Sequence, residues 1–74
     1  MTTLPSFTGL ELIAVLKKAG FEIIRIKGSH HFLRHDDGRS TVIPMHSGES
    51  IGPGLFNKIL RDCDLKREQF LKLL

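Results

Sequence analysis

The sequence is short of the residues that cross-link a small protein. It has 74 residues and a single cysteine, Cys63, with no tryptophan and no tyrosine. One cysteine excludes an internal disulfide. A chain of this length then depends on a small apolar core, and a reducing compartment suits it better than an oxidising one. The N-terminal residues also lack the charged and apolar regions of a secretory signal. We therefore expect a cytoplasmic protein.

Long apolar runs are missing as well. The longest covers Leu12–Leu16, whereas a membrane-spanning helix needs about 20 such residues, so no membrane contact is expected. The length predicts one domain over residues 1–74. Eleven lysines and arginines against eight acidic residues give a net charge of +3. This excess favours a polyanionic partner, though only weakly.

The clearest local signal is a helix over residues 9–19. Thr8 and Glu11 have the spacing of a capping box, and Phe7 with Leu12 fits the apolar contact that often accompanies it. Apolar residues then follow at helical spacing, and Gly20 is a typical helix stop.

Three short strands are predicted next, over residues 21–26, 30–35 and 40–43, with turns at Gly28 and Gly38. A polar loop covers residues 45–52, and Pro53 suits the first turn of a second helix. Asp64 is expected to cap a further short helix. The order α-β-β-β-α-α predicts an α+β fold: a three-stranded antiparallel sheet, helices packed on one face, and a short extra C-terminal helix.

The four histidines are candidate metal ligands. His30, His31, His35 and His46 lie within 17 residues of one another. Neighbouring strand residues point to opposite faces, so His30 and His31 cannot easily share one ion. We therefore expect no metal site and no cofactor. Cys63 falls on the apolar face of the second helix, which favours a buried inert thiol over a nucleophile.

The most informative stretch is Lys27-Gly28-Ser29-His30-His31-Phe32. A glycine turn here precedes a strand that begins with His30, near Arg25 and Lys27. RNA can be cleaved through its own 2′-hydroxyl by a base, an acid and positive charge near the phosphorus. Imidazole titrates near neutral pH and can serve as base or acid, while the cations or backbone N–H groups can supply the charge. A structural or simply exposed strand histidine is the competing interpretation.

The same residues, with four other segments, resemble the HicA (YcfA-like) toxin family. The matching segments are Leu12–Phe21, Lys27–Leu33, Val42–His46, Ile51–Leu55 with Ile59–Asp62, and Gln69–Leu71. The resemblance runs over roughly residues 8–73. Two departures are Leu33, where an aromatic residue is common, and Cys63-Asp64, where Ala-Gly often ends the helix.

What the resemblance implies is a double-stranded-RNA-binding-domain-like fold that serves as an mRNA interferase, the toxin of a type II toxin–antitoxin system. It implies a HicB-like antitoxin that covers the active face, and His30 as the catalytic residue. We expect the antitoxin to contact His30, Phe32 and Arg34, which share an exposed face if Leu33 enters the core. The expected contacts to RNA are Arg25, Lys27, Ser29, Arg34, Arg39 and His46.

Two other functions remain open from the sequence. One is an RNA-binding module of this fold that does not cleave RNA. The other is a degenerate toxin that only binds an antitoxin. His31 has either a packing or a functional role, and His46 either a loop-forming or a phosphate-binding role.

Overall fold

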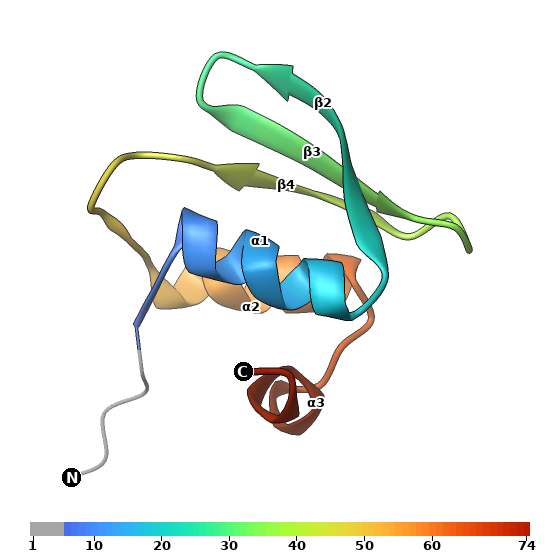
Figure 1. Cartoon of the computed structure of the whole chain (residues 1–74). Coiled ribbons are helices and arrows are strands. Elements are labelled where there is room, and N and C mark those ends of the chain that lie inside the picture. Colours follow the sequence, from blue (N-terminus) through green and yellow to red (C-terminus); the bar gives the residue numbers. More distant parts are fainter. Residues whose placement is uncertain (1–5) are drawn as a thin grey trace, which may run out of the picture.

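The computed structural model describes residues 6–74, and its central feature is an antiparallel sheet with all helices on one side (Figure 1). The sheet has the order β2-β3-β4. The elements are β1 (Phe7–Thr8), α1 (Gly9–Lys18), β2 (Phe21–Lys27), β3 (His30–His35), β4 (Ser40–Pro44), β5 (Ser50–Ile51), α2 (Pro53–Asp62) and α3 (Arg67–Lys72). The expected α+β fold is confirmed, with the α-β-β-β-α order of double-stranded-RNA-binding domains and an extra C-terminal helix.

Helix α1 begins and ends as its sequence predicts. The Thr8 side chain accepts a hydrogen bond from the Glu11 N–H, and the Glu11 carboxylate accepts one from the Thr8 N–H at 2.9 Å. Gly20 follows the helix with φ of +99°, and a Cβ there would lie 2.8 Å from Nε2 of His35. Glycine therefore serves both the backbone conformation and the close approach of β3.

Two tight hairpins connect the strands. The β2–β3 turn consists of Gly28, at φ +59°, and Ser29, whose φ is not positive. Glycine at the first central position fits a type II′ turn. In the β3–β4 turn, Gly38 at φ +99° donates its N–H to the His35 carbonyl at 2.9 Å. Both predicted turns are confirmed.

The core lies between the sheet and the pair α1 and α2. Its fully buried side chains include Phe21, Leu12, Leu16, Leu33, Ile43 and Ile59. Thr41, a buried polar residue of β4, donates a hydrogen bond to Oδ2 of Asp62 at 3.0 Å, and Lys58 donates to the same oxygen at 3.0 Å. These contacts join β4 to α2.

A second apolar layer holds α3 on the side of α1 and α2 that faces away from the sheet (Figure 1). Phe70 of α3 packs edge-on against Phe7 and Phe56, at ring-centroid distances of 5.1 and 5.2 Å. Phe7 belongs to β1, which pairs with β5 through Phe7 and Ile51. The polar loop predicted over residues 45–52 is therefore only partly right, because Ser50–Ile51 form β5. A two-residue strand is too short to show a pattern in the sequence.

Asp64 does not cap α3, which corrects that prediction. It adopts a left-handed conformation, φ +53°, directly after Cys63, the C-cap residue of α2. Its N–H bonds to the Arg61 carbonyl, and the Leu65 N–H bonds to the Leu60 carbonyl at 2.9 Å. These two bonds form a Schellman motif, so Asp64 takes the position that glycine usually holds. The residue that precedes α3 is Lys66.

No helix within residues 6–74 is both long and apolar enough to cross a membrane.

Candidate functional site

The sheet face that carries no helix is formed by three rows of paired residues, here called the outer face. Across β2, β3 and β4 the rows are Lys27–His30–Pro44, Arg25–Phe32–Val42 and Glu22–Arg34–Ser40. Leu33 is fully buried on the opposite side. Leu33 therefore enters the core, and His30, Phe32 and Arg34 share the outer face, as expected from the alternation along the strand.

His30 lies at the end of the outer face where the chain makes its β2–β3 turn. It is exposed, and it begins β3 directly after Gly28 and Ser29. Its cross-strand partner is Lys27, also exposed. Paired residues that flank a two-residue turn have Cα atoms about 5.5 Å apart. An imidazole and an ammonium group thus project from neighbouring positions into solvent.

A β-bulge brings Arg25 onto the outer face. Ile23 pairs with buried Leu33, whereas Arg25 pairs with Phe32, and the register shifts between them at Ile24. Without this extra residue, Arg25 would share the helix-facing side with Ile23, because strand residues alternate. Instead the Arg25 guanidinium lies 6.0 Å from the Phe32 ring centroid, which places a cation next to an aromatic surface.

His31 points the other way. Its strand partners are Ile26 and Ile43, on the side of the sheet that faces the helices. The side chain is half-buried, and its buried Nδ1 has no hydrogen-bond partner among residues 6–74. Two adjacent histidines are therefore in different environments, one facing solvent and one facing the helices.

Arg39, predicted to bind RNA, does not lie on the outer face. Its Nε bonds to Oδ2 of Asp37 at 2.9 Å, and its guanidinium donates to the Cys63 carbonyl and lies 5.2 Å from the Phe21 ring centroid. The Asp37 carboxylate raises the pKa of Arg39, which in turn lowers the pKa of Asp37. These contacts join the β3–β4 turn to the end of α2, so we assign Arg39 a structural role.

Ser29 and His46 lie near the His30 end of the sheet. The Met45 N–H donates to the Ser29 carbonyl at 2.6 Å, which fixes the start of the loop after β4. His46 follows and is exposed. A hollow of about 430 Å³ is formed by this loop and the start of α1, with the lining residues Thr8, Gly9, Leu10, Met45, His46, Ser47 and Gly48.

Cys63 is completely buried. Burial, with a smaller contribution from Asp62, raises its pKa to about 12. The thiol therefore stays protonated at neutral pH, and Cys63 is a packing residue.

Within residues 6–74, no three histidine, cysteine or acidic side chains lie close enough together to hold a metal ion.

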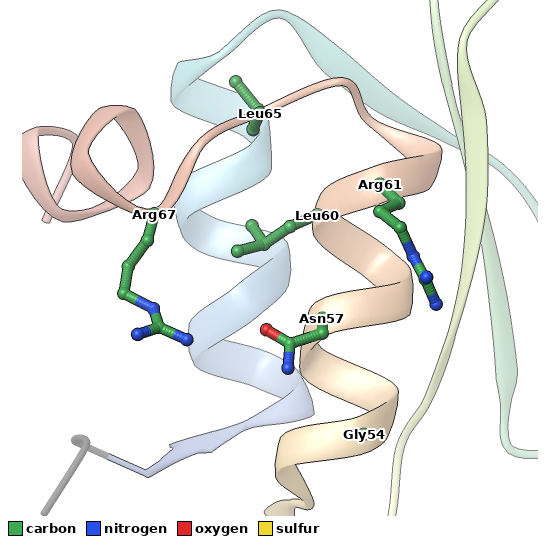
Figure 2. A pocket seen from close by; sticks show the side chains of 6 residues that line it. All are labelled: Gly54, Asn57, Leu60, Arg61, Leu65 and Arg67. Atoms are coloured by element: carbon green, nitrogen blue, oxygen red, sulfur yellow. The ribbon is translucent and has the colours of Figure 1, made fainter.

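The largest hollow described, about 570 Å³, lies on the helical side of the molecule, between α2 and α3 (Figure 2). It is lined by Gly54, Asn57, Leu60, Arg61, Leu65 and Arg67. None of these is a residue that the sequence analysis assigned to catalysis or binding. The candidate site is therefore an open face and not this hollow, which suits a long polymeric substrate better than a small molecule.

Comparison with known proteins gives one family match. The model of the family described as the HicA toxin of bacterial toxin–antitoxin systems matches residues 9–65, a range that includes the whole outer face. A search of curated proteins finds no match.

Proposed function

The chain belongs to the HicA toxin family of bacterial toxin–antitoxin systems, and on that basis we propose that it is a metal-independent endoribonuclease that cleaves mRNA in the cytoplasm. The observation that supports this most strongly is the position of His30: exposed, at the start of β3, and paired across the strands with Lys27. The outer face is the proposed RNA-binding surface.

The proposed reaction uses the 2′-hydroxyl of the substrate as nucleophile. The imidazole of His30 takes the 2′ proton, the 2′ oxygen forms a bond to phosphorus, the P–O5′ bond breaks, and the 5′ oxygen takes up a proton from water. The ammonium group of Lys27 stabilises the negative charge that develops on the phosphate oxygens. The products are a 2′,3′-cyclic phosphate and a 5′-hydroxyl.

The remaining outer-face residues bind and position the RNA. Arg25 and Arg34 are exposed cations in the second and third rows, and both are free of salt bridges within residues 6–74. Phe32 offers a half-buried ring on which a base can stack. Ser29 and His46 are proposed to contact a phosphate next to the scissile bond.

The chemistry of the cleaved ends tests this proposal against a metal-dependent nuclease. A defined RNA incubated with purified protein in EDTA should be cut to 2′,3′-cyclic phosphate or 3′-phosphate ends, which mass spectrometry identifies. Loss of cleavage in EDTA with recovery on adding a divalent metal would exclude the mechanism. RNA binding without cleavage would favour the non-catalytic module.

Binding should depend strongly on salt because the contacts are ionic. We expect log Kd to rise with log salt concentration, with a slope of about 0.7 for each phosphate contacted on single-stranded RNA. Arg34→Ala should lower that slope by about 0.7, the contribution of one phosphate contact. Arg39→Ala is the matched control, and its slope should be unchanged. An affinity that is equal at low and high salt would contradict the basic outer face.

A toxin–antitoxin partner follows from the family, and we propose that it is a HicB-like protein that covers His30, Phe32 and Arg34. This surface has an aromatic centre with charged residues around it, the arrangement common at protein interfaces. When the complex forms, hydrogen exchange should show increased protection of the β3 amides. Chemical modification of the His30 side chain should be blocked in the same complex. Protection restricted to α1, with the outer face still reactive, would rule out direct occlusion.

A further inference from the structure

The sheet has a free edge along β2. This strand is at one side of the order β2-β3-β4, and no other strand of residues 6–74 pairs with that side (Figure 1). Two of its isoleucines, Ile24 and Ile26, are each 58% exposed. A free strand edge with apolar side chains is a template for pairing with another strand.

The backbone groups that face this edge can be identified from the hairpin. Lys27 and His30 flank a two-residue turn, so they exchange backbone hydrogen bonds, and successive residues of β3 then face β2 and β4 in alternation. The bond from the His35 N–H to the Arg39 carbonyl, 2.8 Å, fits this alternation because it places His35 toward β4.

The same alternation directs His31 and Leu33 toward β4. Their partners on β2 are Ile26 and Ile23. The amide and carbonyl groups of these two isoleucines therefore point to the free edge, where no strand of residues 6–74 receives them.

We propose that β2 pairs with β2 of a second copy of this chain, antiparallel, about a twofold axis between Ile24 and Arg25. In this register Ile23 of one copy lies opposite Ile26 of the other. These are the residues with free backbone groups, so the two copies exchange backbone hydrogen bonds on both sides of the axis.

The side chains agree with this register. Glu22 lies opposite Lys27 of the second copy, which sets opposite charges together at both ends of the interface. Because of the bulge, Glu22 and Lys27 both belong to the outer face, whereas Ile23 and Ile26 both belong to the helix-facing side. Residues on the same face therefore meet, as pairing between two sheets requires.

Neighbouring registers are less favourable. A shift by one residue in one direction sets Arg25 opposite Arg25 of the second copy. A shift in the other direction sets Glu22 opposite Ile26, and both charge pairs are lost. Since the order of charges on β2 is complementary to itself, a second copy fits this edge better than an unrelated strand.

The dimer is a six-stranded sheet with the helices of both copies on one side and two His30 residues on the other. Stable interfaces bury about 1,200–2,000 Å², and a pair of seven-residue strands is small by comparison. We therefore describe a weak dimer that forms as the concentration rises. It is independent of the proposed ribonuclease activity, which its absence would leave intact.

Analytical ultracentrifugation of the full chain from about 10 µM to about 1 mM tests the dimer. The wild type should shift from monomer to dimer over this range. Glu22→Lys should weaken association about tenfold, because two favourable pairs become like-charge pairs. The double variant Glu22→Lys/Lys27→Glu should recover it to within about threefold. Both variants place the same lysine at position 22, beside Arg34 of the same copy. Recovery of association in the double variant therefore cannot come from relief of that contact within one copy.

Glu49→Lys is the control for net charge, because Glu49 is an exposed loop residue away from β2. It should leave association unchanged. A wild type that stays monomeric throughout would overturn the proposal. So would a double variant that associates no better than Glu22→Lys, or a Glu49→Lys variant that is weakened equally.

Discussion

His30→Ala should lower the rate of RNA cleavage by about 10³–10⁴-fold while the protein keeps its fold and its RNA affinity. The reason is that general acid–base groups contribute about 10²–10⁴-fold, and a sole proton-transferring residue belongs at the upper end of that range. The side chain is exposed at the start of β3 and supports no part of the core. Single-turnover cleavage of a defined RNA, with thermal melts and binding measurements, separates the three properties.

His31→Ala is the matched control from the next position in the chain. Its side chain faces the helices and is half-buried, so we expect a loss of stability of about 1 kcal/mol and little change in cleavage. The assignment is mistaken if His30→Ala cuts at the normal rate, or if His31→Ala is folded and inactive.

Leu33→Ala should destabilise the protein so strongly that little of it remains folded at physiological temperature. Leu33 has no exposed surface, and truncation of a buried leucine costs about 2–5 kcal/mol. Domains are stable by only about 0.05–0.15 kcal/mol per residue, so this loss is a large fraction of the total for a chain of this size. Denaturant unfolding followed by circular dichroism measures it.

Phe32→Ala, one residue earlier, should behave in the opposite way. Phe32 belongs to the outer face and contacts Arg25. We expect a stability change of less than about 1 kcal/mol, but weaker binding of RNA and antitoxin. If Phe32→Ala unfolds the protein and Leu33→Ala does not, the two faces of β3 have been assigned in reverse.

Much of the fold could be predicted because its signals are local. The cap at Thr8, the glycines at the turns and the alternation along β3 each depend on a few neighbouring residues. Their predictions are confirmed to within a residue or two at the element ends. The paired strands β1 and β5 were missed because two residues carry no periodic pattern and their pairing joins Phe7 to Ile51, far away in the sequence.

The candidate site was only partly predictable for a related reason. The bulge at Ile24 changes the alternation of β2, and no local pattern marked it. For Arg39, the sequence shows only a charge like that of the other cations. Its contacts with the Cys63 carbonyl and Phe21 depend on how α2 and β2 approach the β3–β4 turn. Aspartate favours the helix N-cap, which is why the sequence predicts that role for Asp64, whereas in the structure it occupies a left-handed position after the C-terminus of α2.

The most direct measurement of the central claim, that this toxin acts through catalysis at His30, is bacterial growth after induction of the chain without its antitoxin. We expect the wild type and the His31→Ala variant to arrest growth. The His30→Ala variant, made at the same level and still able to bind the antitoxin, should not. Growth arrest of equal strength by the His30→Ala variant would contradict the claim.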